Sequence, residues 1–511
     1  MAYLCRDCPI AERTFLVPAI VQLPVGSNVM RCHYVFDLKP RPDGSIDKFK
    51  ARLVADGNSQ KQGVDFDAVF ATVVKLASIR IILAVAALRG WRLWQFDIKQ
   101  AFLQADLQEN LYMHMPPNLT RYDADGDALV CRLKKTLYGL RQASREWCAV
   151  LSRTLLEYGF RRCITDTCVY RYDDTTTGYV LVLMVYVDDL ILCYSHDDAR
   201  LDFSAYLTSR LPVDDRGALR WVLRMELTQD LGRHEIVVSQ AQYARKLVAK
   251  YLGPSASVRV CDSPLDETCD LSDPQHSPAP DTPEHRAMAP KRAHYMSAVG
   301  ALLWLAGGTR PDIAYAVALL ARFCTNPGAA HLSALERVLA YVGRTADRVL
   351  RFTPEASLGF QVYSDASWAT RNSVSGGLVF FHGCAVMWWT RRQKSVSTST
   401  VEAEYFAASL ASREAVWCVD FAEDVGFGVK APTPLLLDNR GAIDLAGDPV
   451  SFKLTKHILR KAYELQDRVA RGVFAPTFVP TVDQLADILT KALRPGVHAV
   501  FIDRLLYDAA S

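Results

Sequence analysis

The stretch from residue 180 to 198, VLVLMVYVDDLILCYSHDD, constrains the fold of this chain more than any other stretch. A β-branched apolar run ends in Tyr186 and Val187, is interrupted by Asp188 and Asp189, and resumes at Leu190. Two apolar strands on either side of a two-residue polar break are typical of a tight hairpin. The sequence therefore predicts a β-hairpin with both aspartates at its tip.

The adjacent carboxylates have two explanations. Because Asp tolerates turn geometry, Asp188 and Asp189 could simply make the turn. However, two carboxylates about 4 Å apart repel by roughly 4 kcal/mol at an effective dielectric near 20. A divalent cation held between them and a phosphate would remove that repulsion. The spacing alone leaves both explanations open.

The bulk composition is that of a globular protein with several domains. Half of the 511 residues are apolar and 23% are charged, which allows about two to four separate cores. The longest apolar runs, residues 81–88 and 179–187, are too short to cross a bilayer, so no membrane partner is expected. The thirteen cysteines, an odd number spread through apolar segments, favour reduced thiols in an intracellular compartment.

The net charge of +3 is small, but the basic residues are clustered. Residues 131–162 carry eight Lys or Arg against two Glu, and residues 453–471 carry six against two acidic residues. Such stretches are typical of a track for a phosphate backbone. They are equally compatible with solvated helix faces.

Residues 33–57 predict a β-hairpin with a turn at residues 42–44. In its second strand Lys48, Lys50 and Arg52 alternate onto one face. That face could hold a triphosphate or could simply be exposed.

Residues 78–98 predict a helix and then a strand with a single acidic residue near its end. Residues 78–89 predict a helix that ends at Gly90, and residues 91–98 predict a strand with Asp97 near its carboxyl end, followed by a helix-prone AFLQADL. A carboxylate at the end of a buried strand is a frequent catalytic position in α/β sheets. A lone Asp is more often a helix cap.

Residues 133–160 pair a basic glycine turn with an amphipathic helix. Its apolar residues recur at helical spacing and are expected in the core; they are Trp147, Val150, Leu151, Leu155 and Tyr158.

Residues 261–293 are rich in Pro, Asp and Ser and predict a linker. The composition does not distinguish a mobile tether from an ordered strap on the surface. Residues 294–349 are then expected to be helical.

The last part of the chain has a β-β-β-α-β-α order in which acidic residues recur at element ends. Strands are expected at residues 358–364, 376–381, 385–390 and 435–437, with a long helix at 400–424. The acidic residues are Asp365 and Asp438 after strands, Glu402 and Glu404 in the long helix, and Asp487 in a final amphipathic helix. Four carboxylates from such elements are a common way to hold two Mg²⁺ ions.

These segments together resemble the reverse transcriptase and RNase H region of copia-like LTR retrotransposon Pol polyproteins. The polymerase motifs are KARLVADGNSQKQGVDFDAVFATVV, QFDIKQAFLQADLQENLYMHMPP, LYGLRQASREW and YVDDLIL, and YMSAVGALLWLAGGTRPDIAYAV resembles the connecting segment. The RNase H motifs are YSDASWA, TSTVEAEYFAAS, LLLDNRGAI, KLTKHI and QLADILTK. The resemblance covers roughly residues 15–495 in one order.

The resemblance implies a fold of the α+β and α/β classes. It predicts a right-hand polymerase with fingers, palm and a small thumb at residues 15–260, then the linker at 261–293 and a helical connection at 294–356. An RNase H-like domain with a mixed five-stranded sheet is expected at residues 357–495. Residues 1–14 and the tail at 496–511 are not assigned.

For the polymerase, the resemblance implies that Asp97, Asp188 and Asp189 bind metal ions. Phe102 would lie under the nucleotide sugar and exclude a 2′-hydroxyl, although its position also suits a buried helical Phe. Gln142 would line the incoming nucleotide, and Lys50 and Arg52 would contact its triphosphate. The implied partners are an RNA template, a DNA primer and dNTPs.

For the RNase H-like domain, the resemblance implies the carboxylates Asp365, Glu404, Asp438 and Asp487. Glu404 is preferred to Glu402 because AEYFA matches the family pattern. These acids would hold two Mg²⁺ ions, or Mn²⁺, and would activate water to cleave the RNA strand of an RNA/DNA hybrid, leaving a 3′-hydroxyl. His457 has no assignable role.

The sequence departs from the family in LLLDNRGAI and KLTKHI, but no catalytic acid is lost. The alternative is therefore a decayed element that keeps nucleic-acid binding without turnover. By the same resemblance the protein is expected in the cytoplasm, within a virus-like particle if the element is intact, or in the nucleus.

Overall fold

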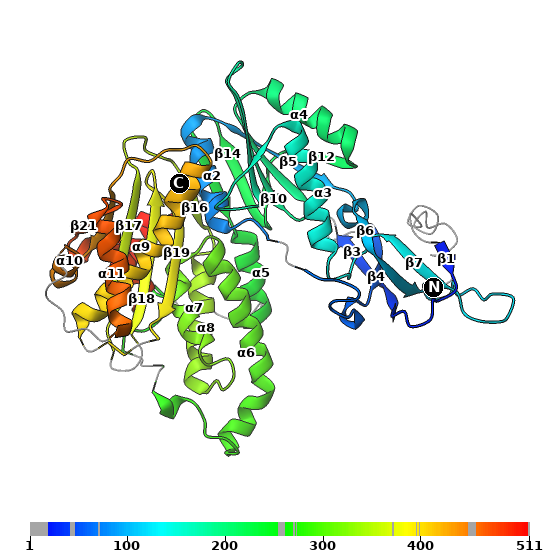
Figure 1. Ribbon diagram of the computed structural model, residues 1–511. Coiled ribbons are helices and arrows are strands. Elements are labelled where there is room, and N and C mark those ends of the chain that lie inside the picture. Colours follow the sequence, from blue (N-terminus) through cyan, green and yellow to red (C-terminus); the bar gives the residue numbers. More distant parts are fainter. Residues whose placement is uncertain are drawn as a thin grey trace. The chain divides into compact units, whose positions relative to one another are not determined.

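The computed structural model describes residues 19–40, 46–69, 72–253, 261–268, 271, 273–369, 373–394, 396–397, 399–447 and 456–508. The unassigned residues 1–14 and the predicted turn at 42–44 lie outside the described residues. The chain, coloured by sequence in Figure 1, divides into two compact units. The first unit comprises residues 1–74, 94–163 and 167–217, and the second comprises residues 75–93, 164–166 and 218–511.

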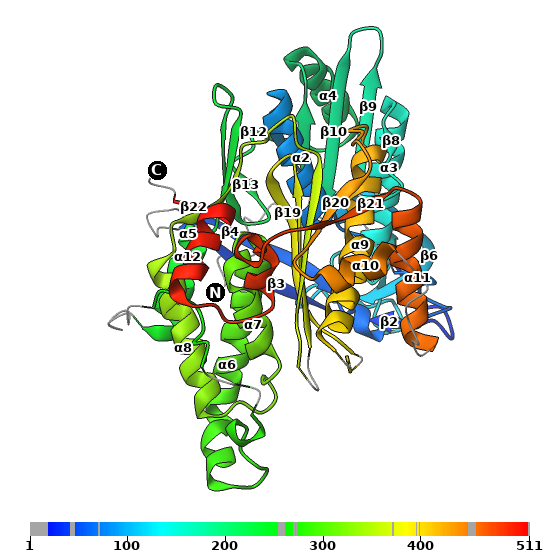
Figure 2. The same cartoon turned by 90° about the vertical axis from the view of Figure 1, so that its left-hand side faces the viewer.

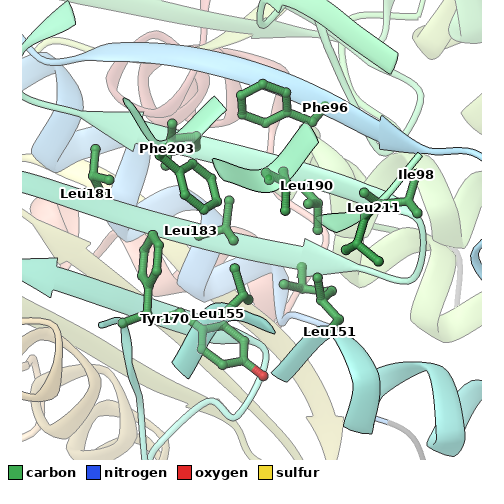
Figure 3. Close-up of a cluster of buried hydrophobic side chains, with 14 of the residues drawn as sticks. Phe96, Ile98, Leu151, Leu155, Tyr170, Leu181, Leu183, Leu190, Phe203 and Leu211 are labelled. Atoms are coloured by element: carbon green, nitrogen blue, oxygen red, sulfur yellow. The ribbon is translucent and has the colours of Figure 1, made fainter. Parts of the chain in front are cut away.

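The first unit contains most of a six-stranded sheet with helices packed on it. Its strand order is β12 (Val213–Ala218), β5 (Arg92–Ile98), β11 (Asp189–Tyr194), β10 (Tyr179–Tyr186), β9 (Val169–Asp174) and β8 (Arg161–Arg162). Helices α3 (Ala143–Tyr158) and α4 (Asp197–Arg210) contribute to its core. As predicted, Trp147, Leu151 and Leu155 are buried, and Figure 3 shows the two leucines in the cluster with Leu183 and Leu190.

The same unit contains two smaller sheets. One has the order β1 (Ala19–Val21), β7 (Val130–Lys135), β6 (Asp106–His114) and β2 (Val29–Met30), and the other is the predicted hairpin of β3 (Cys32–Pro40) and β4 (Ile46–Ala55). A short 3-10 helix, η1 (Gly57–Ser59), follows this hairpin.

The expected helix at AFLQADL is wrong. Residues Ala101–Gln104 form a 3-10 turn, η2, and β6 begins at Asp106. Gln100 adopts a left-handed φ of 52°, which no regular right-handed helix contains. Leu111 and Met113 are buried while their neighbours are less so, and this alternation lets β6 pair with β7.

The second unit combines a sheet with a group of helices. The strand order is β13 (Trp221–Val222), β14 (Met225–Asp230), β15 (Glu235–Ser239), β16 (Arg348–Phe352) and β22 (Tyr507–Asp508). Its helices include α2 (Leu76–Arg89), α5 (Ala241–Leu252), α6 (Pro283–Gly308), α7 (Ala314–Ala321) and α8 (Ala329–Arg344), with the short turns η3 (Pro274–His276) and η4 (Pro311–Ile313). No helix among the described residues is both long and apolar enough to cross a membrane.

The predicted linker is partly helical and partly an ordered strap. Helix α6 begins at Pro283, because Thr282 caps it by accepting a hydrogen bond from the backbone N–H of His285 at 3.2 Å. Among the described residues before it, Cys261, Leu265 and Leu271 are buried. The described residues thus favour the strap over the tether, and the helix begins earlier than the expected residue 294.

The second unit also contains the predicted mixed five-stranded sheet. Its order is β19 (Cys384–Arg392), β18 (Val374–Phe381), β17 (Phe360–Ser367), β20 (Thr433–Leu437) and β21 (Phe474–Phe478). β17, β20 and β21 run parallel, whereas β18 pairs antiparallel with β17 and β19. The remaining helices are α9 (Thr400–Asp424), α10 (Arg440–Gly447), α11 (Lys456–Ala470) and α12 (Pro495–Leu505), and Figure 2 shows α9, α10 and α11 beside β20 and β21.

Asp487 does not lie in an amphipathic α-helix as predicted. It lies in a 3-10 turn, η7 (Leu485–Leu489), which follows the shorter turn η6 (Thr481–Asp483). The buried side chain of Gln484 accepts a hydrogen bond from the N–H of Ala486 and donates to the carbonyl of Ser364 at 3.0 Å. This anchor ties the turn to β17 and stops it from extending into a regular helix.

Candidate active sites

The first acidic group lies at the tip of the β10–β11 hairpin. Tyr186 pairs with Asp189, so the turn residues are Val187 and Asp188 rather than the two aspartates. Val187 has a φ of 59°, which for a β-branched residue costs about 1–3 kcal/mol. Its carbonyl accepts a hydrogen bond from Trp147 Nε1 at 2.7 Å, which holds the turn in place. The hairpin prediction is confirmed, with the turn one residue earlier than expected.

Asp97 is brought to the same place by strand pairing. β5 lies beside β11, and the N–H of Ile98 donates to the carbonyl of Asp188 at 2.9 Å. Partial burial, followed by the charges of neighbouring acids, raises the pKa values of Asp188 and Asp189. Gln95 donates to Asp189 at 3.2 Å and Arg216 lies 3.7 Å from Asp97. The three predicted acids therefore lie at the same end of the neighbouring strands β5 and β11.

Basic and aromatic side chains accompany these acids. The charges of Lys50 and Arg52 lower the pKa of Asp188, against the larger effect of burial. The Arg52 guanidinium lies 5.9 Å from the centre of the Tyr138 ring, which contacts Phe102 edge-on at 5.2 Å. This places Phe102 next to the basic strand, partly buried in η2.

Gln142 is completely buried in this structure. Its side chain accepts a hydrogen bond from Gln60 at 3.0 Å and donates to the carbonyl of Asp65 at 2.9 Å. Both ends of the amide are thus engaged within the protein, and contact with a nucleotide stays a prediction for this residue.

The second acidic group is tighter. One carboxylate oxygen from each of Asp365, Glu404 and Asp438 lies within 4.8 Å of the others. Asp365 is in β17, Glu404 is in α9 and Asp438 directly follows β20. Within the described part of the chain this is the only group of three or more possible metal ligands at that spacing, and Glu404 rather than Glu402 belongs to it.

Burial gives this group unusual electrostatics. Burial first, and then the charges of Asp365 and Asp438, raise the pKa of Glu404 to about 10. Asp487 is 4% exposed, and burial together with the charge of Asp365 raises its pKa to about 7. A bound cation would stabilise the ionised form of these buried acids.

Lys491 supplies a positive charge next to these acids. This residue was not predicted from the sequence. Its ammonium lies 2.9 Å from Asp487 and 3.8 Å from Asp365. The spacing of four residues from Asp487 was the available signal, since residues at i and i+4 can pair. The neighbouring Thr490 hydroxyl donates to Asp365, and the Thr481 hydroxyl donates to Asp438 at 3.0 Å.

Both groups fit divalent cations by the chemistry of their donors. Carboxylate oxygens are the ligands that Mg²⁺ and Mn²⁺ prefer, and burial together with neighbouring acids raises the pKa values of Asp189 and Glu404. His457 lies near the start of α11, but its side chain is outside the described side chains.

The sequence of the chain is similar to those of several known proteins. The family described as Reverse transcriptase (RNA-dependent DNA polymerase) matches residues 16–258. The Pol polyprotein of transposon TNT 1-94 from Nicotiana tabacum is 32% identical over 93% of this chain and 35% of its own length. That of transposon RE1 from Arabidopsis thaliana is 33% identical over 94% of this chain and 32% of its own length.

The chain thus spans about a third of the length of these relatives. A solved foamy viral protease–reverse transcriptase in complex with double-stranded DNA covers 92% of this chain and 68% of its own, at 10% identity and a TM-score of 0.47. That likeness is too weak to establish a shared arrangement. On the sequence matches, residues 16–258 belong to the reverse transcriptase family, and the chain is similar to a segment of the Pol polyproteins of copia-like retrotransposons.

Proposed function

We propose that this protein is an RNA-directed DNA polymerase that copies retrotransposon RNA into DNA and also cleaves the RNA strand of the resulting hybrid. The observation that carries the proposal is the convergence of Asp97, Asp188 and Asp189 beside Lys50 and Arg52. Family membership of residues 16–258 supports the same activity.

At the first site, Asp97, Asp188 and Asp189 would hold two Mg²⁺ ions, with Mn²⁺ as a substitute. When bound, these ions favour loss of the primer 3′-hydroxyl proton and neutralise the triphosphate of the incoming dNTP. Lys50 and Arg52 would bind and orient the triphosphate, and positioning accounts for much of the rate in such transfers. Phe102, held edge-on against Tyr138, would exclude a ribose 2′-hydroxyl.

At the second site, Asp365, Glu404, Asp438 and Asp487 would hold the metal pair of an RNase H reaction. Metal ions in such a group supply an activated water and stabilise the departing oxygen. The tight spacing of three of these acids supports this proposal. Glu404 would carry a proton in the metal-free protein and lose it when a cation binds, because burial and neighbouring acids disfavour its charge.

Primer extension tests the polymerase proposal. The full chain, an RNA template, a DNA primer, dNTPs and Mg²⁺ should give extended product, and a labelled RNA/DNA hybrid should be cut in the RNA strand. Absence of both products from a folded preparation that binds hybrid would support the alternative, a catalytically decayed nucleic-acid-binding protein.

A further inference from the structure

Helix α2 belongs by sequence to the reverse transcriptase match but by contact to the second unit. It lies within residues 16–258, yet its residues fall in the compact unit that contains the acid group of Asp365. Every residue from 77 to 87 of this helix is buried. A helix that is apolar on all sides requires neighbours on all sides, so its surroundings decide its stability.

Arg80 connects α2 to the five-stranded sheet. Its guanidinium donates hydrogen bonds to the carbonyls of Gly307 and, at 2.7 Å, Gly308 at the end of α6, and to Val386 in β19 at 3.3 Å. It also stacks 3.8 Å from the ring of Trp388, whose Nε1 donates to Ala306 at 2.9 Å. The last carbonyls of a helix have no intrahelical partner. Arg80 and Trp388 therefore cap α6 together.

A second contact joins α2 to helix α9. The ammonium of Lys75 lies 3.9 Å from the ring of Trp417. Asp166 accepts hydrogen bonds from the hydroxyl of Ser78 at 2.6 Å and from the N–H of Lys75 at 3.1 Å. Trp417 Nε1 in turn donates to the carbonyl of Thr165 at 3.2 Å. Two separate segments of the reverse transcriptase match are thus attached to α9.

The chain passes from α2 directly into a catalytic strand. Gly90, with a left-handed φ of 64°, ends the helix, and β5 with Asp97 begins at Arg92. Gln229 Nε2 donates to the carbonyl of Trp91 at 2.7 Å, and His234 bonds the carbonyl of Ala87 at 2.9 Å. The start of β5 is therefore fixed by contacts within the second unit.

We infer that the RNase H-like region supports DNA synthesis as a scaffold, because Trp388 and Trp417 hold α2 and thereby the strand that carries Asp97. The inference deepens the proposed polymerase function and rests on it. In this inference, β19 and α9 bind segments of the reverse transcriptase match within the same chain. These two tryptophans are positioning residues, since neither touches the reacting atoms.

The test uses Trp388→Ala in the full chain. DNA synthesis should fall about tenfold, as expected for loss of a partly buried cation–π contact and of the hydrogen bond to Ala306. The control is Phe478→Ala, because Phe478 is 44% exposed and lies in β21 at the opposite edge of the same sheet. It should leave DNA synthesis within about twofold, as expected for an exposed surface substitution.

Amide hydrogen exchange gives a readout that is independent of activity. Trp388→Ala should speed exchange in α2 and in β5, whereas Phe478→Ala should leave both unchanged. Normal DNA synthesis, or unchanged exchange in β5, would overturn the inference. If Trp388→Ala does not fold, Trp388→Phe, which keeps a ring and loses the N–H bond to Ala306, should show the same changes at about two- to threefold.

The proposed function and the inference fail differently. A wild-type chain that makes no DNA contradicts the proposed function. In that case amide hydrogen exchange in β5 still tests the inference. Faster exchange in Trp388→Ala would support a scaffold role of the RNase H-like region, and unchanged exchange would contradict it.

Discussion

The two acidic groups of this protein differ in how far their carboxylates are exposed to solvent. At the first, Asp188 is exposed, the Asp97 side chain is 32% exposed, and the charges of Lys50, Arg52 and Arg216 act on the acids. At the second, Asp365 is 2% exposed and Glu404 is 8% exposed. Burial raises pKa values in both groups, but the acids of the second group are more deeply buried, and Lys491 is the basic side chain paired with them.

From this difference in burial we expect metal binding to be coupled more strongly to folding at the second group than at the first. A cation bound to the native state stabilises it by mass action, and the gain is largest where the acids are otherwise poorly solvated. Loss of metal should therefore silence the first site and destabilise the second.

The largest expected effect is that of Asp188→Asn on DNA synthesis. The change removes one negative charge at an exposed turn, so DNA synthesis should fall at least about 100-fold, as for loss of one transition-state contact. Hybrid cleavage should stay within about twofold, as for a surface substitution that leaves the other site intact. Parallel primer-extension and cleavage assays measure both, and loss of both activities would indicate one shared site.

Glu404→Gln should have the converse effect. Hybrid cleavage should fall at least about 100-fold, while DNA synthesis is retained. Glu402→Gln is the matched control in the same helix, because Glu402 lies outside the group of close acids. Equal loss of cleavage in both variants would contradict the assignment of Glu404.

Metal removal and pH should change stability through the second group. The pKa of Asp487 is raised from 3.8 to about 7, so the native state keeps a proton that the unfolded state releases. In a chelator the free energy of unfolding should therefore be greatest at low pH for this group and fall as pH rises toward 7.

Asp487→Asn should flatten this dependence, and Mg²⁺ at pH 8 should raise the melting temperature by roughly 2–4 °C per kcal/mol of restored stability. Differential scanning calorimetry at pH 5 and pH 8 measures both effects. Asp188→Asn is the control variant, and it should change the pH dependence of the melting temperature little. A wild-type melting temperature that rises with pH in chelator would contradict the description of the second group.

The smallest expected effect concerns Phe102. Phe102→Val should reduce discrimination against ribonucleotides by about tenfold, because one lost steric contact in an apolar site is worth about 1–3 kcal/mol. The ratio of dNTP to rNTP incorporation is the measurement, and it does not depend on how much of the variant is folded. An unchanged ratio would leave Phe102 as a packing residue against Tyr138.

Strong local patterns predicted most of the fold. The apolar runs around Asp188 and in α9 set a hairpin and a helix whose positions the structure confirms to within a residue or two. The apolar runs before VYSD and LLLD likewise predicted Asp365 and Asp438, which the structure brings together, although Asp365 lies within β17 and not after its end.

Features that depend on distant partners were not predictable. AFLQADL has helical composition, but β6 exists because β7 pairs with it. The turn that carries Asp487 is set by the contact of Gln484 with Ser364, more than a hundred residues away in sequence. Similarly, the helical period of α2 gave no indication that Arg80 contacts β19.

Anomalous diffraction from the full chain crystallised with Mn²⁺ and an RNA/DNA hybrid would locate the metal ions at both acidic groups. We expect manganese peaks at two separate places, one beside Asp97, Asp188 and Asp189, and one among Asp365, Glu404 and Asp438. Manganese at only one of the two groups, or at neither while hybrid is bound, would contradict this expectation.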